Sequence, residues 1–201
     1  MASRGRSRAL GVLAAAALAL GGCSDDGRTL EPTSATMPPS SEVAATSTTD
    51  AAFGLRVSSP DAPDGAELDV TFTCDGVGDA PELVFSGAPP AAAELAVAVV
   101  DIDAADRVHF VASGLPSTAT GLDPLQPPTD AVLGRSDGDV LGWEPPCLSR
   151  EDGTHRFEIR LYAMAEPVGL TPGLTGEDAI AVLDRASIDV HRSTFTYAAA
   201  G

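Results

Sequence analysis

Apolar and polar residues alternate along several short stretches of the chain, and this pattern predicts a protein built mainly from β-strands. The clearest stretch is residues 157–163, where apolar side chains occupy every second position. Successive side chains of a strand point to opposite faces, so this alternation is typical of a half-buried strand. Residues 68–73 alternate in the same way. Residues 94–100 are almost continuously apolar, which indicates a central strand covered on both faces.

Shorter signals complete the expected elements. Further strands are expected at residues 53–57, 82–86, 109–113 and 193–198. One late helix is expected, because Thr175 is a good N-cap and precedes an acidic first turn and an apolar helical face. Residues 117–142 show no regular pattern, and a connection of that length in a compact domain is usually functional or mobile. The set favours an antiparallel β architecture with two sheets and one helix.

The N-terminal residues differ in composition and indicate export. Three arginines precede an apolar run at residues 9–20, which is too short to span a bilayer as a mature helix. The run ends in Leu20-Gly21-Gly22-Cys23, which resembles a bacterial lipobox whose cysteine is lipid-modified. A simple signal peptide with a chance cysteine is the alternative. We predict a signal peptide at residues 1–23, a disordered Ser/Thr/Pro/Ala-rich tether at 24–52 and a folded domain at 53–201.

The chain is strongly acidic, which excludes one class of partner. Its formal net charge at pH 7 is −17, and all twelve basic residues are arginine. A surface of this sign repels nucleic acid and anionic lipid head groups. We therefore expect no nucleic-acid partner, and we expect a membrane to hold the protein only through the lipid on Cys23.

The cysteine count indicates one disulfide. If Cys23 carries lipid, Cys74 and Cys147 remain as an even pair in an exported domain, and a disulfide between them is the simplest interpretation. Two buried free thiols are the alternative. The chain has no Cys-x-x-Cys and no His-x-x-x-His spacing, so we expect no metal and no cofactor.

Six short motifs occur in the order and at the spacing of a known family. They are Phe72-Thr73-Cys74-Asp75-Gly76, Ser86-Gly87-Ala88-Pro89, Asp101-Ile102-Asp103, His109-Phe110 before Gly114-Leu115-Pro116, Pro146-Cys147 before His155-Arg156, and Leu161-Tyr162-Ala163. Together they resemble the phosphatidylethanolamine-binding protein family, and most closely its bacterial Raf-kinase-inhibitor-like branch. The resemblance covers about residues 53–197. It implies a mainly β fold with a large central antiparallel sheet, a smaller second sheet and one or two peripheral helices.

The resemblance also implies a pocket at one end of the fold for phosphate, acetate or a phosphorylated head group. The ligand-binding residues expected in this sequence are Asp101, Asp103, His109, Trp143, Pro146, His155 and Phe157. Some positions depart from the family pattern. The Asp101 motif lacks both of its prolines, and Phe157 replaces a tyrosine, which removes a hydroxyl donor. Trp143 fits a pocket wall or ordinary core packing equally well.

The residues themselves allow more than one function. Two histidines beside a carboxylate can donate to one anion, and more strongly when protonated. The same side chains can instead form a buried polar network that braces the end of the sheet. We identify no serine in a Gly-x-Ser-x-Gly nucleophile elbow and no metal-ligand spacing, so we expect no catalytic residues and no enzymatic activity.

We therefore expect an exported, lipid-anchored binding protein with a small-anion or phospho-head-group pocket. The alternative is a protein-interaction or inhibitor module in which the pocket is purely structural. Its contact surface would be residues 117–142, and an exposed apolar patch there would favour this alternative.

Overall fold

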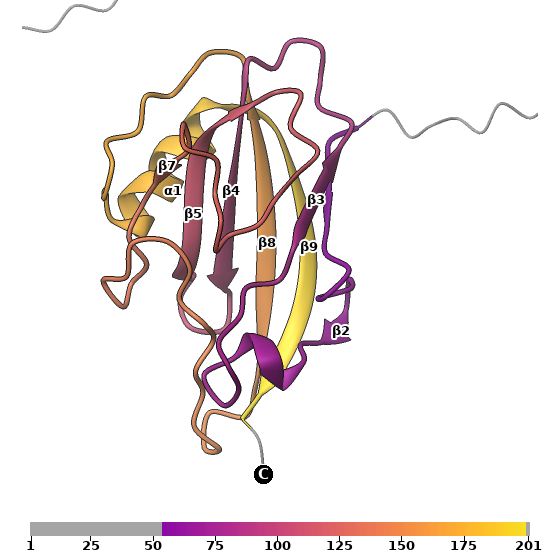
Figure 1. Cartoon of the computed structure of the whole chain (residues 1–201), viewed down its shortest axis with the longest axis vertical. Coiled ribbons are helices and arrows are strands. Elements are labelled where there is room, and N and C mark those ends of the chain that lie inside the picture. The colour runs from indigo at the N-terminus through magenta and orange to yellow at the C-terminus, as the bar shows by residue number, and fades with distance from the viewer. Residues whose placement is uncertain (1–53, 200–201) are drawn as a thin grey trace, which may run out of the picture. The chain divides into compact units, whose positions relative to one another are not determined.

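A computed structural model describes residues 54–199, which form two β-sheets, one α-helix and one 3-10 turn (Figure 1). The strands are β1 (Arg56–Ser58), β2 (Ala66–Glu67), β3 (Leu83–Ser86), β4 (Glu94–Asp101), β5 (Arg107–Pro116), β6 (Gly121–Leu122), β7 (Val132–Leu133), β8 (Thr154–Met164) and β9 (Ser187–Ala198). The helical segments are η1 (Val70–Phe72) and α1 (Gly176–Ala186). The prediction of a mainly β fold with a large and a small sheet is confirmed.

The larger sheet contains six strands in the order β2-β9-β8-β4-β5-β7, and the smaller contains three in the order β1-β3-β6. All pairs in the larger sheet are antiparallel except β2 with β9, so the sheet is mixed at one edge. Strand β4 is buried along its whole length, as its continuous apolar sequence predicts.

The larger sheet has a hydrophobic cluster on each face. On one face Val97, Val99 and Phe157 pack with Phe85 of the small sheet. On the other face Ala96, Ala98 and Tyr162 pack with residues of α1. Figure 1 shows α1 and β3 on opposite sides of the sheet. The alternation along β4 and β8 divides these side chains between the two clusters.

The helix begins where the sequence predicts. Thr175 is its N-cap, and the Thr175 side chain accepts a hydrogen bond from the Asp178 amide. Ala179, Ile180 and Leu183 form its buried face. The last strand starts earlier than the expected residue 193, because β9 follows the helix directly at Ser187.

The prediction of a strand at residues 68–73 is wrong. Only Ala66–Glu67 pairs as a strand, and the chain then turns into η1. Asp69 caps this turn, since its side chain accepts a hydrogen bond from the Thr71 amide at 2.9 Å. Thr73 closes it by donating its hydroxyl to the Val70 carbonyl. These local side-chain bonds outweigh the alternating pattern.

The predicted signal peptide, Cys23 and the tether lie outside residues 54–199, so they stay predictions. Within those residues, no helix is both long and apolar enough to cross a membrane.

Candidate functional site

Three of the predicted ligand-binding residues meet at one end of the larger sheet. Asp101 is the last residue of β4, His109 lies near the start of β5, and His155 is the second residue of β8. Strand β4 lies between the other two strands, so Asp101 stands between the two histidines. The registers pair Asp101 with Phe157 and His155 with Tyr197, which places these side chains on the face that packs against the small sheet.

Asp101 and His155 form a close pair. The Asp101 Oδ2 atom lies 2.6 Å from His155 Nδ1, and the Asp101 side chain is almost fully buried. The other carboxylate oxygen accepts hydrogen bonds from the backbone amides of Asp103 and Ala104. The hydrogen bond with Asp101 raises the pKa of His155 above its usual value. The pair therefore favours the protonated form of the His155 ring.

His109 reaches the same face because of a β-bulge. Val99 pairs with Phe110 and Val100 pairs with Val108, so His109 is an extra residue between two registered pairs. Such a residue bends the strand and redirects its side chain. The His109 ring meets the edge of Phe157, with 5.4 Å between the ring centroids.

Glu144 holds His109 from the long connection that precedes β8. The His109 Nδ1 atom lies 3.0 Å from the Glu144 carbonyl oxygen, and the Glu144 amide donates to the His109 carbonyl at 2.9 Å. The Glu144 carboxylate pairs with Arg107 at 2.6 Å and accepts from the Gly138 amide. The second ring nitrogen of His109, Nε2, is buried and has no hydrogen-bond partner among residues 54–199. Burial lowers the pKa of His109.

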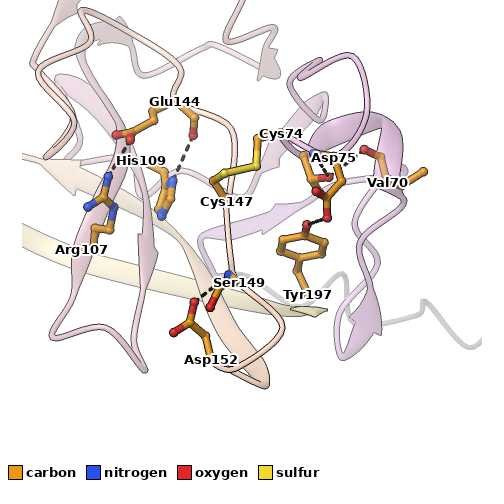
Figure 2. Close-up of a disulfide and its surroundings, with 11 residues drawn as sticks. Val70, Cys74, Asp75, Arg107, His109, Glu144, Cys147, Ser149, Asp152 and Tyr197 are labelled. Carbon is orange, nitrogen blue, oxygen red and sulfur yellow. Dashed lines mark hydrogen bonds and ion pairs between the residues drawn. A yellow bond between two sulfur atoms is a disulfide. The ribbon is translucent and has the colours of Figure 1, made fainter. Parts of the chain in front are cut away.

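The predicted disulfide between Cys74 and Cys147 is confirmed. Their Cα atoms are 5.2 Å apart, and the Cys74 amide donates to the Pro146 carbonyl at 3.0 Å. Figure 2 shows the disulfide between His109 on one side and Tyr197 on the other. The Tyr197 hydroxyl donates to Asp75 at 2.6 Å. The disulfide thus joins the two loops that flank the end of the sheet.

Asp103 points to a different partner from the one expected. Its carboxylate binds the Arg156 guanidinium through two hydrogen bonds, at 2.7 and 3.0 Å, and accepts from the Arg156 amide at 2.8 Å. The hydrogen bonds from Arg156 lower the pKa of Asp103 to about 2. Asp103 therefore ties the β4–β5 turn to β8, and it lies close enough to His155 for its charge to raise the pKa of that histidine.

The other predicted residues line the core side of the site. Phe157 is fully buried and stacks on Phe195, with 5.1 Å between ring centroids. Trp143 is buried within the same cluster, and Pro146, which directly precedes Cys147, is also buried. These three residues pack the region behind the histidines, and none of their side chains supplies a hydrogen bond to it.

Sequence reasoning missed Glu144 and Tyr197, whose partners lie far away in the sequence and give no local signal. It also missed a literal Gly-x-Ser-x-Gly match at Gly134-Arg135-Ser136-Asp137-Gly138. The structure places this match in a tight turn before β8, where the Ser136 hydroxyl accepts from the Val140 amide at 3.1 Å. It is not a strand-to-helix elbow, and no hydrogen bond joins Ser136 to a histidine among the residues that the structure describes.

The candidate site is only partly accessible to solvent. Asp101 and His109 are buried, while the His155 side chain keeps 16% of its surface exposed. Pockets lie elsewhere in the described residues, among them an open pocket of about 550 Å³ lined by Gly54, Gly87 and Pro90. Within the described part of the chain, no group of three or more His, Cys, Asp or Glu side chains could hold a metal ion.

Comparison with known proteins identifies the family of the chain. A model of the family described as phosphatidylethanolamine-binding protein matches residues 58–198. The chain belongs to this family. It is 34% identical over 186 residues to a Mycobacterium tuberculosis protein named "Putative lipoprotein LppC", and the match covers 90% of each chain.

Solved structures of family members share the fold. One is a phosphatidylethanolamine-binding protein homologue, CT736, from Chlamydia trachomatis, with a TM-score of 0.66 and 25% identity over 74% of this chain and 99% of that chain. Another is E. coli YbcL, described as a member of the mammalian family, with a TM-score of 0.68 and 24% identity over 73% and 99%.

Proposed function

We propose that this protein is an exported, lipid-anchored and non-enzymatic binding protein that holds a small anion or a phosphorylated head group at Asp101, His109 and His155. The observation that carries the proposal is the buried Nε2 atom of His109, which has no partner within residues 54–199. A buried polar atom without a partner is rare in a purely structural network and points to a missing hydrogen-bond partner.

The His155 ring supports binding of an anion. Asp101 raises the pKa of His155 and so favours the protonated ring, whose other nitrogen can donate to an anion. Its partial exposure lets a ligand approach from solvent. Membership of the phosphatidylethanolamine-binding protein family agrees with a phosphorylated ligand.

The proposal of a lipid anchor is supported by the sequence around Cys23 and by one relative. Cys23 ends a lipobox-like sequence, and the most extensive match described above is to a protein named as a lipoprotein. The Cys74–Cys147 disulfide fits an oxidising compartment outside the cytoplasm. Labelling of the protein by a radioactive fatty acid in cells, lost in Cys23→Ser, would support the anchor. Equal labelling of both forms would contradict it.

The proposal that the protein is not an enzyme is supported by the hydrogen-bond partners of the two histidines. Among the described residues, the hydrogen bonds of the His109 and His155 rings go to a backbone carbonyl and a carboxylate, not to a hydroxyl or thiol nucleophile. Phosphoethanolamine incubated with the protein should therefore be recovered intact. Release of inorganic phosphate at a rate that falls in His155→Ala would overturn this part of the proposal.

Binding is tested on the mature chain with Cys23→Ser, which carries no lipid. We expect phosphate and phosphoethanolamine to shift the NMR signals of His109 and His155 in a saturable way, with His191 as an internal control. The shifts should disappear in His155→Ala, with thermal unfolding used to check that the variant is folded at the temperature of the titration. The absence of any shift at high millimolar ligand would contradict the proposal.

A protein-interaction module is the second candidate, and exposed apolar side chains support it. Leu125, Val140 and Leu141 lie in the 117–142 connection and expose 53%, 41% and 54% of their surfaces. Replacing all three with serine should leave anion binding unchanged but abolish binding of a protein partner, if the domain uses this surface.

A further inference from the structure

The hydrogen-bond partners of His109 fix the role of each of its ring nitrogens. The Glu144 carbonyl oxygen can only accept, so His109 Nδ1, 3.0 Å away, must carry the proton. Burial lowers the pKa of His109, so the ring is neutral at neutral pH and Nε2 holds a lone pair. His109 Nε2 is therefore an acceptor, and it cannot donate to a fully deprotonated oxyanion.

The partners of His155 produce the opposite role. Asp101 Oδ2 accepts from His155 Nδ1, while Asp101 Oδ1 is occupied by the amides of Asp103 and Ala104. The hydrogen bond with Asp101 raises the pKa of His155 and so favours the protonated ring, in which Nε2 is a donor. The site offers a donor on β8 and a neutral acceptor on β5, the two strands that flank β4.

We propose that this site selects oxyanions that carry a hydroxyl hydrogen, such as inorganic phosphate or a singly protonated phosphomonoester, and that His109 is the residue that sets this specificity. The inference rests on the proposed function. A P–O⁻ oxygen accepts from His155 Nε2, and a P–OH group donates to His109 Nε2. Sulfate at neutral pH and a phosphodiester lack that hydrogen and leave the buried acceptor unpaired.

The surrounding charges favour the protonated form of the ligand for a separate reason. Around His109 the charged groups are Arg107, Glu144 and Asp101, and around His155 they are Asp101, Asp103 and Asp152. Arg107 and Arg156 are already paired with Glu144 and Asp103. Carboxylates thus face the site from several elements, and each additional negative charge on a ligand is repelled.

Discrimination of this kind has a measurable size. Leaving a buried acceptor unpaired costs enough to change a dissociation constant by about ten-fold or more. His109 Nε2 is buried, so a ligand reaches it only when neighbouring side chains move. That requirement weakens binding of every anion equally and does not alter the ratio between two anions of similar shape.

The test is calorimetric titration of the mature chain with Cys23→Ser, using phosphate, sulfate and methyl phosphate at about pH 5.5 and pH 8. Phosphate keeps a hydroxyl hydrogen at both pH values and sulfate has none at either. Methyl phosphate loses its hydrogen near pH 6. We expect phosphate to bind about ten-fold more tightly than sulfate at both pH values. Methyl phosphate should match phosphate at the lower pH and fall to the level of sulfate at the higher.

Two matched variants test which histidine discriminates phosphate from sulfate. His109→Asn keeps a donor for the Glu144 carbonyl but deletes the Nε2 acceptor, so the phosphate-to-sulfate ratio should fall to about one. His155→Asn keeps a donor for Asp101 but deletes the charged Nε2 donor, so both anions should weaken together and the ratio should persist. Thermal unfolding checks that each variant is folded. If His109→Asn fails to fold, the pH dependence of methyl phosphate in the unchanged chain carries the test.

Several results would overturn the inference. Equal affinity for phosphate and sulfate would show that His109 does not use its acceptor, while the proposed anion site would survive. Tight binding of glycerophosphoethanolamine, a diester, would do the same. Failure of every anion to bind would overturn both the specificity and the proposed function.

Discussion

Removal of the Cys74–Cys147 disulfide should cost this domain a large part of its stability. The two cysteines are 73 residues apart in the sequence. In the chain-entropy model, opening a loop of that length destabilises the folded state by about 4 kcal/mol, because the unfolded chain regains its freedom. Both half-cystines are exposed, so serine at each position adds little cost from packing. The predicted loss is comparable to the whole stability of a marginal domain.

The measurement compares urea unfolding of the oxidised chain, the chemically reduced chain and the double variant Cys74→Ser/Cys147→Ser, all with Cys23→Ser. The reduced chain and the double variant should agree, and both should unfold at a much lower urea concentration than the oxidised chain. A steeper dependence on urea is also expected, since the unlinked unfolded chain exposes more surface. A loss below about 1 kcal/mol would refute loop entropy as the source of stabilisation. The bond from the Cys74 amide to the Pro146 carbonyl would then be sufficient to join the loops.

Three further predictions concern single side chains. Asp101 raises the pKa of His155, so the pair contributes its full stabilisation below the unfolded pKa of about 6.5 and loses it as pH rises through the folded pKa. NMR titration of His155 should show the raised pKa. Asp101→Asn should abolish this rise. Burial lowers the pKa of His191, whose Nδ1 accepts a hydrogen bond from the Val57 amide at 3.1 Å. The contribution of His191 to stability is therefore present above pH 6.5, about the unfolded pKa, and is lost as pH falls through the folded pKa. Hydrogen exchange at the Val57 amide should accelerate on acidification, and an unchanged exchange rate would contradict this prediction. Thr175→Ala removes the N-cap of α1 and should lower the free energy of unfolding by about 1 kcal/mol, measured in urea, whereas Thr175→Ser should retain most of it.

Much of the fold was predictable because burial repeats along the chain with the period of each element. The alternation at residues 157–163 and the continuous apolar run at 94–100 correspond to β8 and β4, which form the centre of the sheet. Local chemistry also located the start of the helix at Thr175. Local chemistry is equally the reason for the failure at residues 68–73, where the Asp69 cap produces a turn. Alternation alone does not report such side-chain bonds.

The site was predictable in its residues but not in its geometry. The resemblance to the family located Asp101, His109 and His155, and the structure brings them to one end of the sheet. The bulge that turns His109 toward Phe157 depends on the register of two strands, which no single sequence displays. The same limit applies to Glu144. It reaches His109 from a connection without periodic pattern, across 35 positions of the chain.

The polar side chains at this end of the sheet are of two kinds, those that only brace turns and loops and those that could bind a ligand. Asp103 with Arg156 and Glu144 with Arg107 are complete pairs, as expected of groups that only hold turns and loops in place. His109 differs, because one of its nitrogens is bonded and the other is buried without a partner in the described residues. A network selected only for stability would gain free energy by pairing that atom or by replacing the ring with an apolar one. Trp143 Nε1 is likewise buried without a partner in the described residues. The unpaired nitrogen of His109 is therefore a feature of this site that bracing leaves unexplained and that a ligand with its own hydrogen would complete.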